Sequence, residues 1–306
     1  MPDPPRLSVG LPVYNGERFL EQAIDSVLNG SFQDFEMIIS DNCSTDRTES
    51  IARDYASRDQ RIRYVRNDRN VGPVANFNQA FDLSRGDYFK WLAYDDLCGP
   101  DLLVRCVAVL DDDPSIALCS ARFVEIDAAG RKIAEQPYRI DLSSTKPHVR
   151  LGNLLCTSKG HPILYGVIRS TVLRATGLLA NYHGSDRALI AALTLRGRLM
   201  EIPEALWESR DHPDRSPRVR ATNAGWDPGR NSGPPQHIAI GAQMVRVLLA
   251  APLSPSERVR CLMSIVQCVA RRSRELTPVV VGELTDAARS RWQRIRVAGT
   301  GPSRPR

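Results

Sequence analysis

Acidic and amide side chains recur directly after four short apolar segments in the first hundred residues. Each polar group contains at least one carboxylate, and the groups lie at 13–17, 41–46, 66–72 and 94–96. Carboxylate oxygens and diphosphate oxygens both coordinate hard divalent cations, so a bound cation lets an acidic site accept an anionic ligand. These residue types therefore predict a metal-assisted site for a diphosphate-containing molecule.

The apolar segments alternate with amphipathic ones, which is typical of a mostly parallel sheet covered by helices. Asp46 and Glu49 have the spacing of a capping box, so we assign Asp46 to a helix start rather than to a ligand. Ligands of such sheets bind at the carboxyl ends of the strands, where all four polar groups would meet. Strands are predicted over 7–12, 35–40, 62–65, 88–92 and 116–123, and helices over 17–29, 46–57, 74–84 and 100–110.

Beyond residue 128 the pattern is looser. We expect a polar loop over 128–150 and a long loop rich in Pro, Gly and Asn over 211–237. An apolar segment lies at 162–168, and helices are predicted near 171–180 and 185–197 and then over 238–251, 256–275 and 279–296.

Charge is unevenly distributed along the 306 residues. Of the 41 basic and 35 acidic residues, 11 Arg and 4 acidic residues lie in 251–306, so all of the basic surplus is C-terminal. A basic tail predicts an anionic partner, either a membrane face or nucleic acid, unless it is simply a solvated helical face. Trp292 is the one aromatic residue among these arginines, which disfavours nucleic acid.

Several protein classes lose support from what the sequence lacks. No run of 18 apolar residues and no signal-type segment before the first strand is present, so a cytoplasmic location is expected. The seven cysteines form no C-x-x-C pair and are interpreted as reduced thiols. Neither a P-loop nor a Gly-x-Gly-x-x-Gly follows the first strand, which disfavours ATPases and dinucleotide-dependent dehydrogenases.

Short motifs in a fixed order carry a resemblance to a known family. They are Leu11-Pro-Val-Tyr-Asn-Gly16, Ile39-Ser-Asp-Asn-Cys-Ser-Thr-Asp46, Asn70-Val-Gly72 with Asn76, Gly86-Asp-Tyr88 leading to Tyr94-Asp-Asp96, Gly184-Ser-Asp186 and Arg210-Asp-His212. Over residues 6–212 the chain resembles family 2 glycosyltransferases of the GT-A fold. The resemblance implies an α/β fold with a mostly parallel, Rossmann-like sheet flanked by helices, here with a C-terminal helical extension.

The resemblance also implies a domain organisation and the roles of individual residues. The nucleotide-sugar-binding catalytic domain would span 1–212. Beyond the resemblance, composition and periodicity predict a loop or linker over 213–237, a basic helical extension over 238–296 and a disordered tail over 297–306. Asp186 would be the catalytic base, and Asp95, Asp96 and His212 would hold Mg²⁺ or Mn²⁺. Ala93 occupies a position that is often acidic in the family. The implied nucleotide-binding residues are Pro12, Tyr14, Asp41, Arg66, Asn70 and Asp95.

The implied reaction moves a sugar from a nucleotide-diphospho-sugar donor to the hydroxyl of a glycolipid, polysaccharide or other cell-envelope precursor. It needs a base for the hydroxyl and charge stabilisation for the leaving diphosphate. No nucleophile for a double displacement is identifiable, so inversion is expected. Two alternatives stay open: a sugar-nucleotide pyrophosphorylase, although residues 13–17 contain no Lys or Arg, and a non-catalytic binding protein with a decayed domain, which Ala93 would favour.

The predicted helix 256–275 places an apolar stripe between arginine-rich ends. The stripe either packs on the catalytic domain, or the arginines face anionic lipid and hold the protein at the inner membrane surface. The stripe comprises Val259, Leu262, Met263, Val266 and Val269 with Ala270, and the arginines are Arg258, Arg260, Arg271, Arg272 and Arg274.

Overall fold

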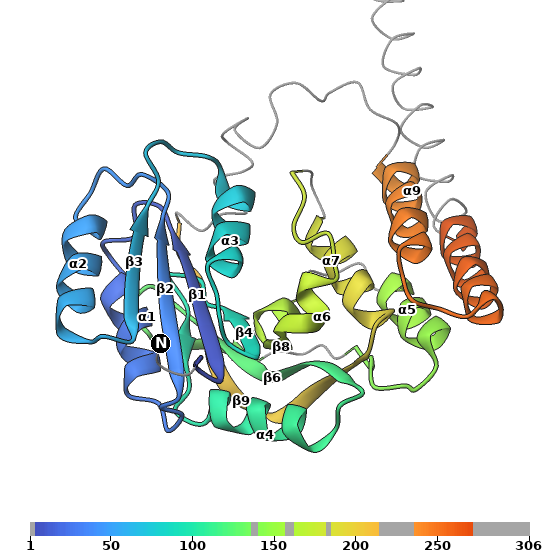
Figure 1. The fold of residues 1–306 in the computed structure, drawn as a ribbon, viewed down its shortest axis with the longest axis horizontal. Helices are drawn as coiled ribbons and strands as arrows, with labels where there is room; N and C mark the ends of the chain where they lie inside the picture. The colour runs from blue at the N-terminus through green and yellow to red at the C-terminus, as the bar shows by residue number, and fades with distance from the viewer. Residues whose placement is uncertain (1–3, 136–139, 157–161, 182–184, 214–235, 272–306) are drawn as a thin grey trace, which may run out of the picture.

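The computed structural model describes residues 4–135, 140–156, 162–181, 185–213 and 236–271 (Figure 1). Its first half is a parallel α/β unit in which α1 and α2 connect neighbouring strands and α3 leads into β4. The strand order is β3-β2-β1-β4, and each pair is parallel. The elements are β1 (Leu7–Val13), α1 (Leu20–Leu28), β2 (Phe35–Asp41), α2 (Thr48–Arg58), β3 (Ile62–Arg66), α3 (Pro73–Asp82) and β4 (Tyr88–Trp91).

The second half extends the same sheet in the order β8-β6-β9-β5, with β7 paired to β6. β8 is antiparallel to β4 and β6, β9 runs parallel to β6, and β5 is antiparallel to β9. The elements are β5 (Leu97–Cys98), α4 (Leu102–Asp112), β6 (Ile116–Ile126), β7 (Lys132–Glu135), α5 (Pro147–Cys156), η1 (Pro162–Tyr165), β8 (Val167–Arg169), α6 (Ser170–Arg174), α7 (Ser185–Thr194) and β9 (Arg198–Arg210).

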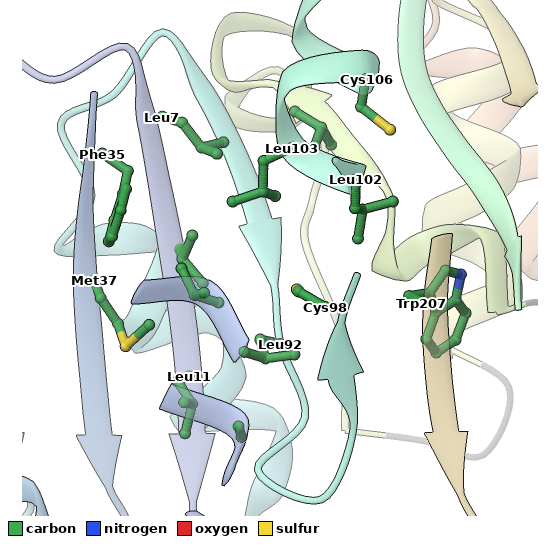
Figure 2. Close-up of a cluster of buried hydrophobic side chains, with 14 of the residues drawn as sticks. Leu7, Leu11, Phe35, Met37, Leu92, Cys98, Leu102, Leu103, Cys106 and Trp207 are labelled. Carbon is green, nitrogen blue, oxygen red and sulfur yellow. The ribbon is translucent and has the colours of Figure 1, made fainter. Parts of the chain in front are cut away.

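The sheet separates two hydrophobic clusters. Every residue of β1 and β2 is buried, as expected for central strands covered on both faces. Figure 2 shows one cluster, which extends from Leu7 and Leu11 of β1 past Leu102 of α4 to Trp207 of β9. The second cluster, on the other face, joins β4 to α5 and α7.

A polar network fixes the amino ends of β1, β2 and β4. Ser8 Oγ donates to Glu36 at 2.7 Å and accepts the amide of Gly86 at 2.8 Å, while Arg85 forms an ion pair with Glu36 at 2.8 Å. A Cβ atom on Gly86 would lie 2.6 Å from the backbone nitrogen of Ser8. The motif glycine before β4 is therefore needed for close packing of two strands.

The structure confirms the five strands and four helices predicted before residue 125, with ends shifted by a few residues. The capping box is wrong: the N-cap of α2 is Arg47, whose side chain makes no capping bond, and Glu49 pairs with Arg53 at 2.8 Å. β5, β8 and β9 were not predicted, because two of them are very short and the pairing of β9 with β6 is irregular. The predicted loop 128–150 contains β7 and the start of α5.

Among the residues described after 235, the structure has two helices, namely α9 (Gln236–Leu249) and a helix over 255–271. The predicted helix 279–296, the tail 297–306 and most of the loop 213–237 lie outside the described residues. In the described part of the chain, no helix is both long and apolar enough to cross a membrane.

Replacing Gly86 by Ala is expected to lower the free energy of unfolding by about 1–3 kcal/mol, because the new methyl group overlaps the backbone of β1. Urea denaturation measures the change. Gly177→Ala is the matched control, since a Cβ there meets nothing within 4 Å, and it should leave stability nearly unchanged. Equal stability of the two variants would show that β4 can move away from β1 at little cost.

Candidate active site

The loops after β1 and β2 are joined by hydrogen bonds between motif residues. The side chain of Asn15 accepts the amide of Thr45 at 2.8 Å, and the Gly16 amide donates to Thr48 Oγ1 at 2.8 Å. Asp46 accepts the amide of Glu17 at 3.0 Å, and the Glu17 carboxylate accepts the amide of Arg47 at 3.0 Å. Two of the acidic residues that suggested a cation site therefore hold loops together.

Asp46 is held as a carboxylate by these contacts. Burial raises its pKa, but hydrogen bonds from Thr48 and Glu17 outweigh the burial and leave the pKa below its ordinary value. The structure thus supports a positional role for Asp46 at the start of α2, although not as the N-cap.

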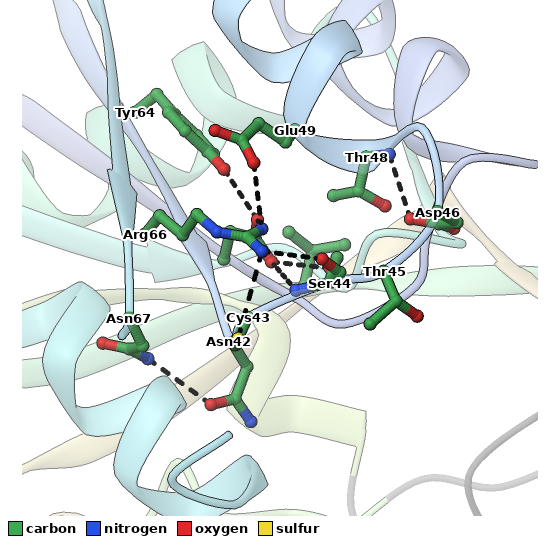
Figure 3. Close-up of polar contacts among 12 residues, drawn as sticks. Asn42, Cys43, Ser44, Thr45, Asp46, Thr48, Glu49, Tyr64, Arg66 and Asn67 are labelled. Carbon is green, nitrogen blue, oxygen red and sulfur yellow. Dashed lines mark hydrogen bonds and ion pairs between the residues drawn. The ribbon is translucent and has the colours of Figure 1, made fainter. Parts of the chain in front are cut away.

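Asp41, at the end of β2, is fully buried, and its donors are Ser44, Tyr64 and Arg66, which are labelled in Figure 3. One carboxylate oxygen accepts the backbone amide and hydroxyl of Ser44 at 2.9 and 2.6 Å. The other accepts the Tyr64 hydroxyl at 2.6 Å and Arg66 at 2.7 Å. These four bonds use about all the acceptor capacity of a carboxylate. A nucleobase could contact Asp41 only after one of these donors moves.

Tyr64 and Arg66 extend this arrangement towards the surface. Burial and the bond to Asp41 raise the pKa of Tyr64, so its hydroxyl remains a donor. Arg66 also donates to the backbone oxygen of Ser44 at 2.9 Å and keeps part of its side chain exposed. Of the predicted nucleotide set, Tyr14 (44% exposed) and Asn70 are exposed and Arg66 is partly exposed, whereas Pro12 is buried in β1.

A ladder of amide side chains shapes the loop after β3. Asn70 Oδ1 accepts from Asn42 at 2.8 Å and from the amide of Gly72 at 2.9 Å. Asn76, buried in α3, accepts from Ser40 Oγ at 2.7 Å. Gly72 has a positive φ of 86°, which glycine adopts readily, and it precedes the first residue of α3. The Asn70 side chain therefore supports this turn, and its predicted contact with the nucleotide stays a prediction.

The acidic pair after β4 lies against the end of β9. Asp95 Oδ2 is 3.0 Å from His212 Nε2, and Asp96 Oδ1 accepts the backbone amide of Arg210 at 2.9 Å. The pairing of β5 with β9, with Leu97 opposite Glu208, produces this contact. The structure thus brings Asp95 into contact with His212 and Asp96 into contact with Arg210, while the metal role that the resemblance implies for Asp95, Asp96 and His212 stays a prediction.

Arg210 is a functional candidate that the sequence analysis quoted in a motif without giving it a role. Its side chain is fully buried, donates to the backbone oxygen of Asp95 at 2.9 Å and to Gln22 at 2.8 Å, and lies 4.6 Å from the ring centroid of Phe19. Burial lowers its pKa despite the nearby carboxylates of Asp95 and Asp96. Only the course of β9, which was not predicted, places this cation beside the acidic loop.

The donor set fits a divalent cation that arrives together with a diphosphate. Asp95, Asp96 and His212 supply oxygen and nitrogen ligands, and the buried Nδ1 of His212 has no hydrogen-bond partner. Within the described ranges, no three His, Cys, Asp or Glu side chains form a group that could hold a metal by itself. Oxygens of the bound ligand would therefore have to complete the coordination shell, as they often do for Mg²⁺.

Asp186 lies apart from this cluster, exposed in the first turn of α7. Its carboxylate accepts the amide of Arg187 at 2.9 Å, and among the described residues no hydrogen bond or ion pair joins it to Asp95, Asp96 or His212. Gly184 of the same motif lies outside the described residues. Asn78 of α3 makes two hydrogen bonds to the backbone of Leu179, which tether the segment leading to α7 beside the parallel unit.

Comparisons with known proteins agree with this geometry. Residues 8–166 match the family model described as glycosyl transferase family 2. A Bacillus subtilis protein named as glycosyltransferase EpsE is 31% identical over 218 residues, which cover 69% of this chain and 74% of that protein. A GalNAc(5)-diNAcBac-PP-undecaprenol beta-1,3-glucosyltransferase of Campylobacter jejuni is 39% identical over 93 residues, 30% of each chain.

An uncharacterized glycosyltransferase of Methanocaldococcus jannaschii is 33% identical over 135 residues, which cover 44% of this chain and 47% of that protein. The chain thus matches about half of the length of that relative.

Solved structures show the same fold. S. aureus TarS in complex with UDP-GlcNAc has a TM-score of 0.60 at 17% identity, over 86% of this chain and 72% of that one. The mannosyltransferase PcManGT of Pyrobaculum calidifontis, in complex with GDP-Man and Mn²⁺, has a TM-score of 0.54 at 16% identity, over 98% and 84%.

The family model covers more than half of the chain, and its span includes the loops of the parallel unit together with the Asp95–Asp96 pair. The mixed α/β sheet flanked by helices is the fold that these relatives share. The chain therefore belongs to glycosyl transferase family 2.

Proposed function

We propose that this chain is an inverting glycosyltransferase that moves a sugar from a nucleoside-diphosphate donor to an acceptor hydroxyl. The observation that supports it most is the acidic loop of Asp95 and Asp96, held against Arg210 and His212 at the carboxyl edge of a nucleotide-binding type of sheet. Such an acidic loop would hold a diphosphate through a bound cation, which can also neutralise charge on the leaving group in sugar transfer.

In this proposal each described group has one task. Asp186 takes the proton of the acceptor hydroxyl, since it is an exposed carboxylate at the start of α7. The segment that leads to α7 is tethered to α3 of the parallel unit. Mg²⁺ or Mn²⁺ held by Asp95, Asp96 and His212 would neutralise charge on the leaving diphosphate. Arg210 acts as a positioning residue, because its contacts are to the loop and not to open space.

Tyr14, Arg66 and Asn70 are the groups we propose to face the nucleotide, with the buried Asp41 behind Arg66. Exposed aromatic and guanidinium groups can stack on or bond to a base and its phosphates. Relatives in complex with UDP-GlcNAc and with GDP-Man support a nucleotide-sugar donor without selecting the base. The relative named for an undecaprenol-linked substrate supports a lipid-linked acceptor of the cell envelope, used at the inner membrane face.

A panel of UDP-, GDP- and dTDP-sugars tests the donor class. We expect one of them, together with Mn²⁺, to raise the melting temperature and to be slowly hydrolysed, because a ligand that binds the folded state stabilises it. Stabilisation without any hydrolysis or transfer would favour the non-catalytic alternative.

Asp95→Asn is expected to lower the turnover number by at least about 100-fold, because it removes one negative ligand from the cation that offsets the diphosphate charge. Rates are measured against Mn²⁺ concentration and in excess EDTA. Asp82→Asn, on the exposed end of α3, is the control and should behave as the wild type. Unchanged activity of Asp95→Asn, or full wild-type activity in EDTA, would contradict a metal role for this loop.

Asp186→Asn is expected to reduce the turnover number by about 10²–10⁴-fold while the dissociation constant of the donor stays the same, because only the base is lost. The side chain is exposed, so folding should not change. Steady-state rates are compared with donor binding measured by calorimetry. Near wild-type turnover in the variant would exclude Asp186 as the base.

A further inference from the structure

The helix over 255–271 carries two apolar faces, and only one of them packs on the protein. Cys261 and Ile265 are buried in the cluster that also contains residues of α5 and α7. Ser264 Oγ donates to the backbone oxygen of His148 at 3.3 Å, and Cys268 Sγ donates to that of Leu155 at 3.3 Å. This inner face attaches the helix to α5.

The outer face is the stripe singled out from the sequence. Val259, Leu262, Met263 and Val266 are 61, 42, 53 and 53% exposed, and their spacing of three and four residues puts them in one row along the helix. Packing on the catalytic domain was one of the two alternatives for this stripe. Of its members, Val269 is partly buried against the inner cluster, whereas the other four valine, leucine and methionine side chains face outwards and a different row packs on the protein. Single exposed apolar side chains are ordinary, whereas a contiguous row of four indicates an interaction surface.

The charges around this row are almost all positive. Residues 236–271 contain four arginines and one acidic residue, Glu257. Glu257 is bound to Ser254 Oγ at 2.6 Å at the start of the helix, whereas Arg260 is exposed and lies beside the row by helical spacing. A second copy placed symmetrically on the row would face it with like charges, which disfavours self-association. An apolar row flanked by cations suits an anionic lipid surface.

We propose that the outer face of helix 255–271, formed by Val259, Leu262, Met263 and Val266, docks in the interface of an anionic lipid membrane. The helix would lie in the membrane plane with this row among the acyl-chain boundaries and Arg260 near the lipid phosphates. It lies at the edge of the molecule in Figure 1, beyond α5.

The position of this face relates it to the acceptor side. The helix attaches to α5 through His148 and Leu155, and Arg187 of α7 donates to the backbone oxygens of Leu154 and Leu155 at 2.9 and 3.1 Å. The contact of helix 255–271 with α5 and the contact of α5 with α7 thus connect the outer face with the start of α7, where Asp186 lies. Delivery of a lipid-linked acceptor to Asp186 rests on the proposed function, whereas docking itself does not.

Co-sedimentation of the full chain with vesicles tests the proposal, in the absence of any sugar donor. The chain should bind vesicles of equal phosphatidylglycerol and phosphatidylcholine and should not bind phosphatidylcholine alone. The double variant Leu262→Gln/Met263→Gln should weaken binding by at least about tenfold, because two exposed apolar groups are lost. Arg260→Gln should weaken it by up to about fivefold, an effect that high salt removes.

Ile133→Gln and Arg131→Gln, on the exposed β7 hairpin, are matched controls that should bind as the wild type does. All variants replace exposed side chains, and melting temperatures together with donor hydrolysis in solution confirm that the fold and the catalytic site are intact. No binding to anionic vesicles, or equal binding by the double variant, overturns the proposal. Self-association that the double variant abolishes without vesicle binding overturns it in favour of a second copy.

Discussion

The acidic loop that carries Asp95 and Asp96 depends on the hydrogen bonds made by the buried guanidinium of Arg210. This guanidinium bonds to the Asp95 backbone, to Gln22 on α1 and to the backbone oxygens of Asp127 and Ala128 after β6, so one side chain joins four segments that are distant in sequence. A buried cation without partners would be costly, and its presence next to two carboxylates offsets the repulsion within the acidic loop. The loop after β4 can therefore keep its shape without a ligand.

Most motif residues in the loops of the parallel unit form hydrogen bonds with one another. Asn15, Thr48 and Asp46 close the loops after β1 and β2, Asn42 and Asn70 close the next one, and Gly16 leaves room for Tyr94, whose ring a Cβ would approach within 2.9 Å. The motif residues thus mainly hold the loops in place, which makes these loops a rigid frame, rather than serve as ligand contacts. Such a frame suits catalysis, because groups fixed before the substrate binds need no rearrangement during the reaction.

The parallel unit could be predicted from the sequence because its central strands are continuous apolar runs separated by amphipathic helices. The contact of Asp95 with His212 was expected only through the family resemblance, since nothing local indicates that residue 212 returns to residue 95. β9 carries that information, and its irregular pairing hides the alternation that reveals a strand. The outer face of helix 255–271 illustrates another limit. Periodicity identified the row of Val259 and Leu262 but could not decide which of the two apolar rows packs on the protein.

β6 and β9 are parallel neighbours in the sheet, although residues 127–197 separate them in the chain. That single excursion contains β7, β8, α5, α6 and α7 and provides both Asp186 and the surface that receives helix 255–271. The excursion begins at the carboxyl end of β6, near the acidic loop, and returns at the amino end of β9, opposite Ile116 at the start of β6. β8 of this excursion lies between β4 and β6 in the sheet, so the excursion could change in length or sequence without disturbing the parallel unit only in its segments outside β8.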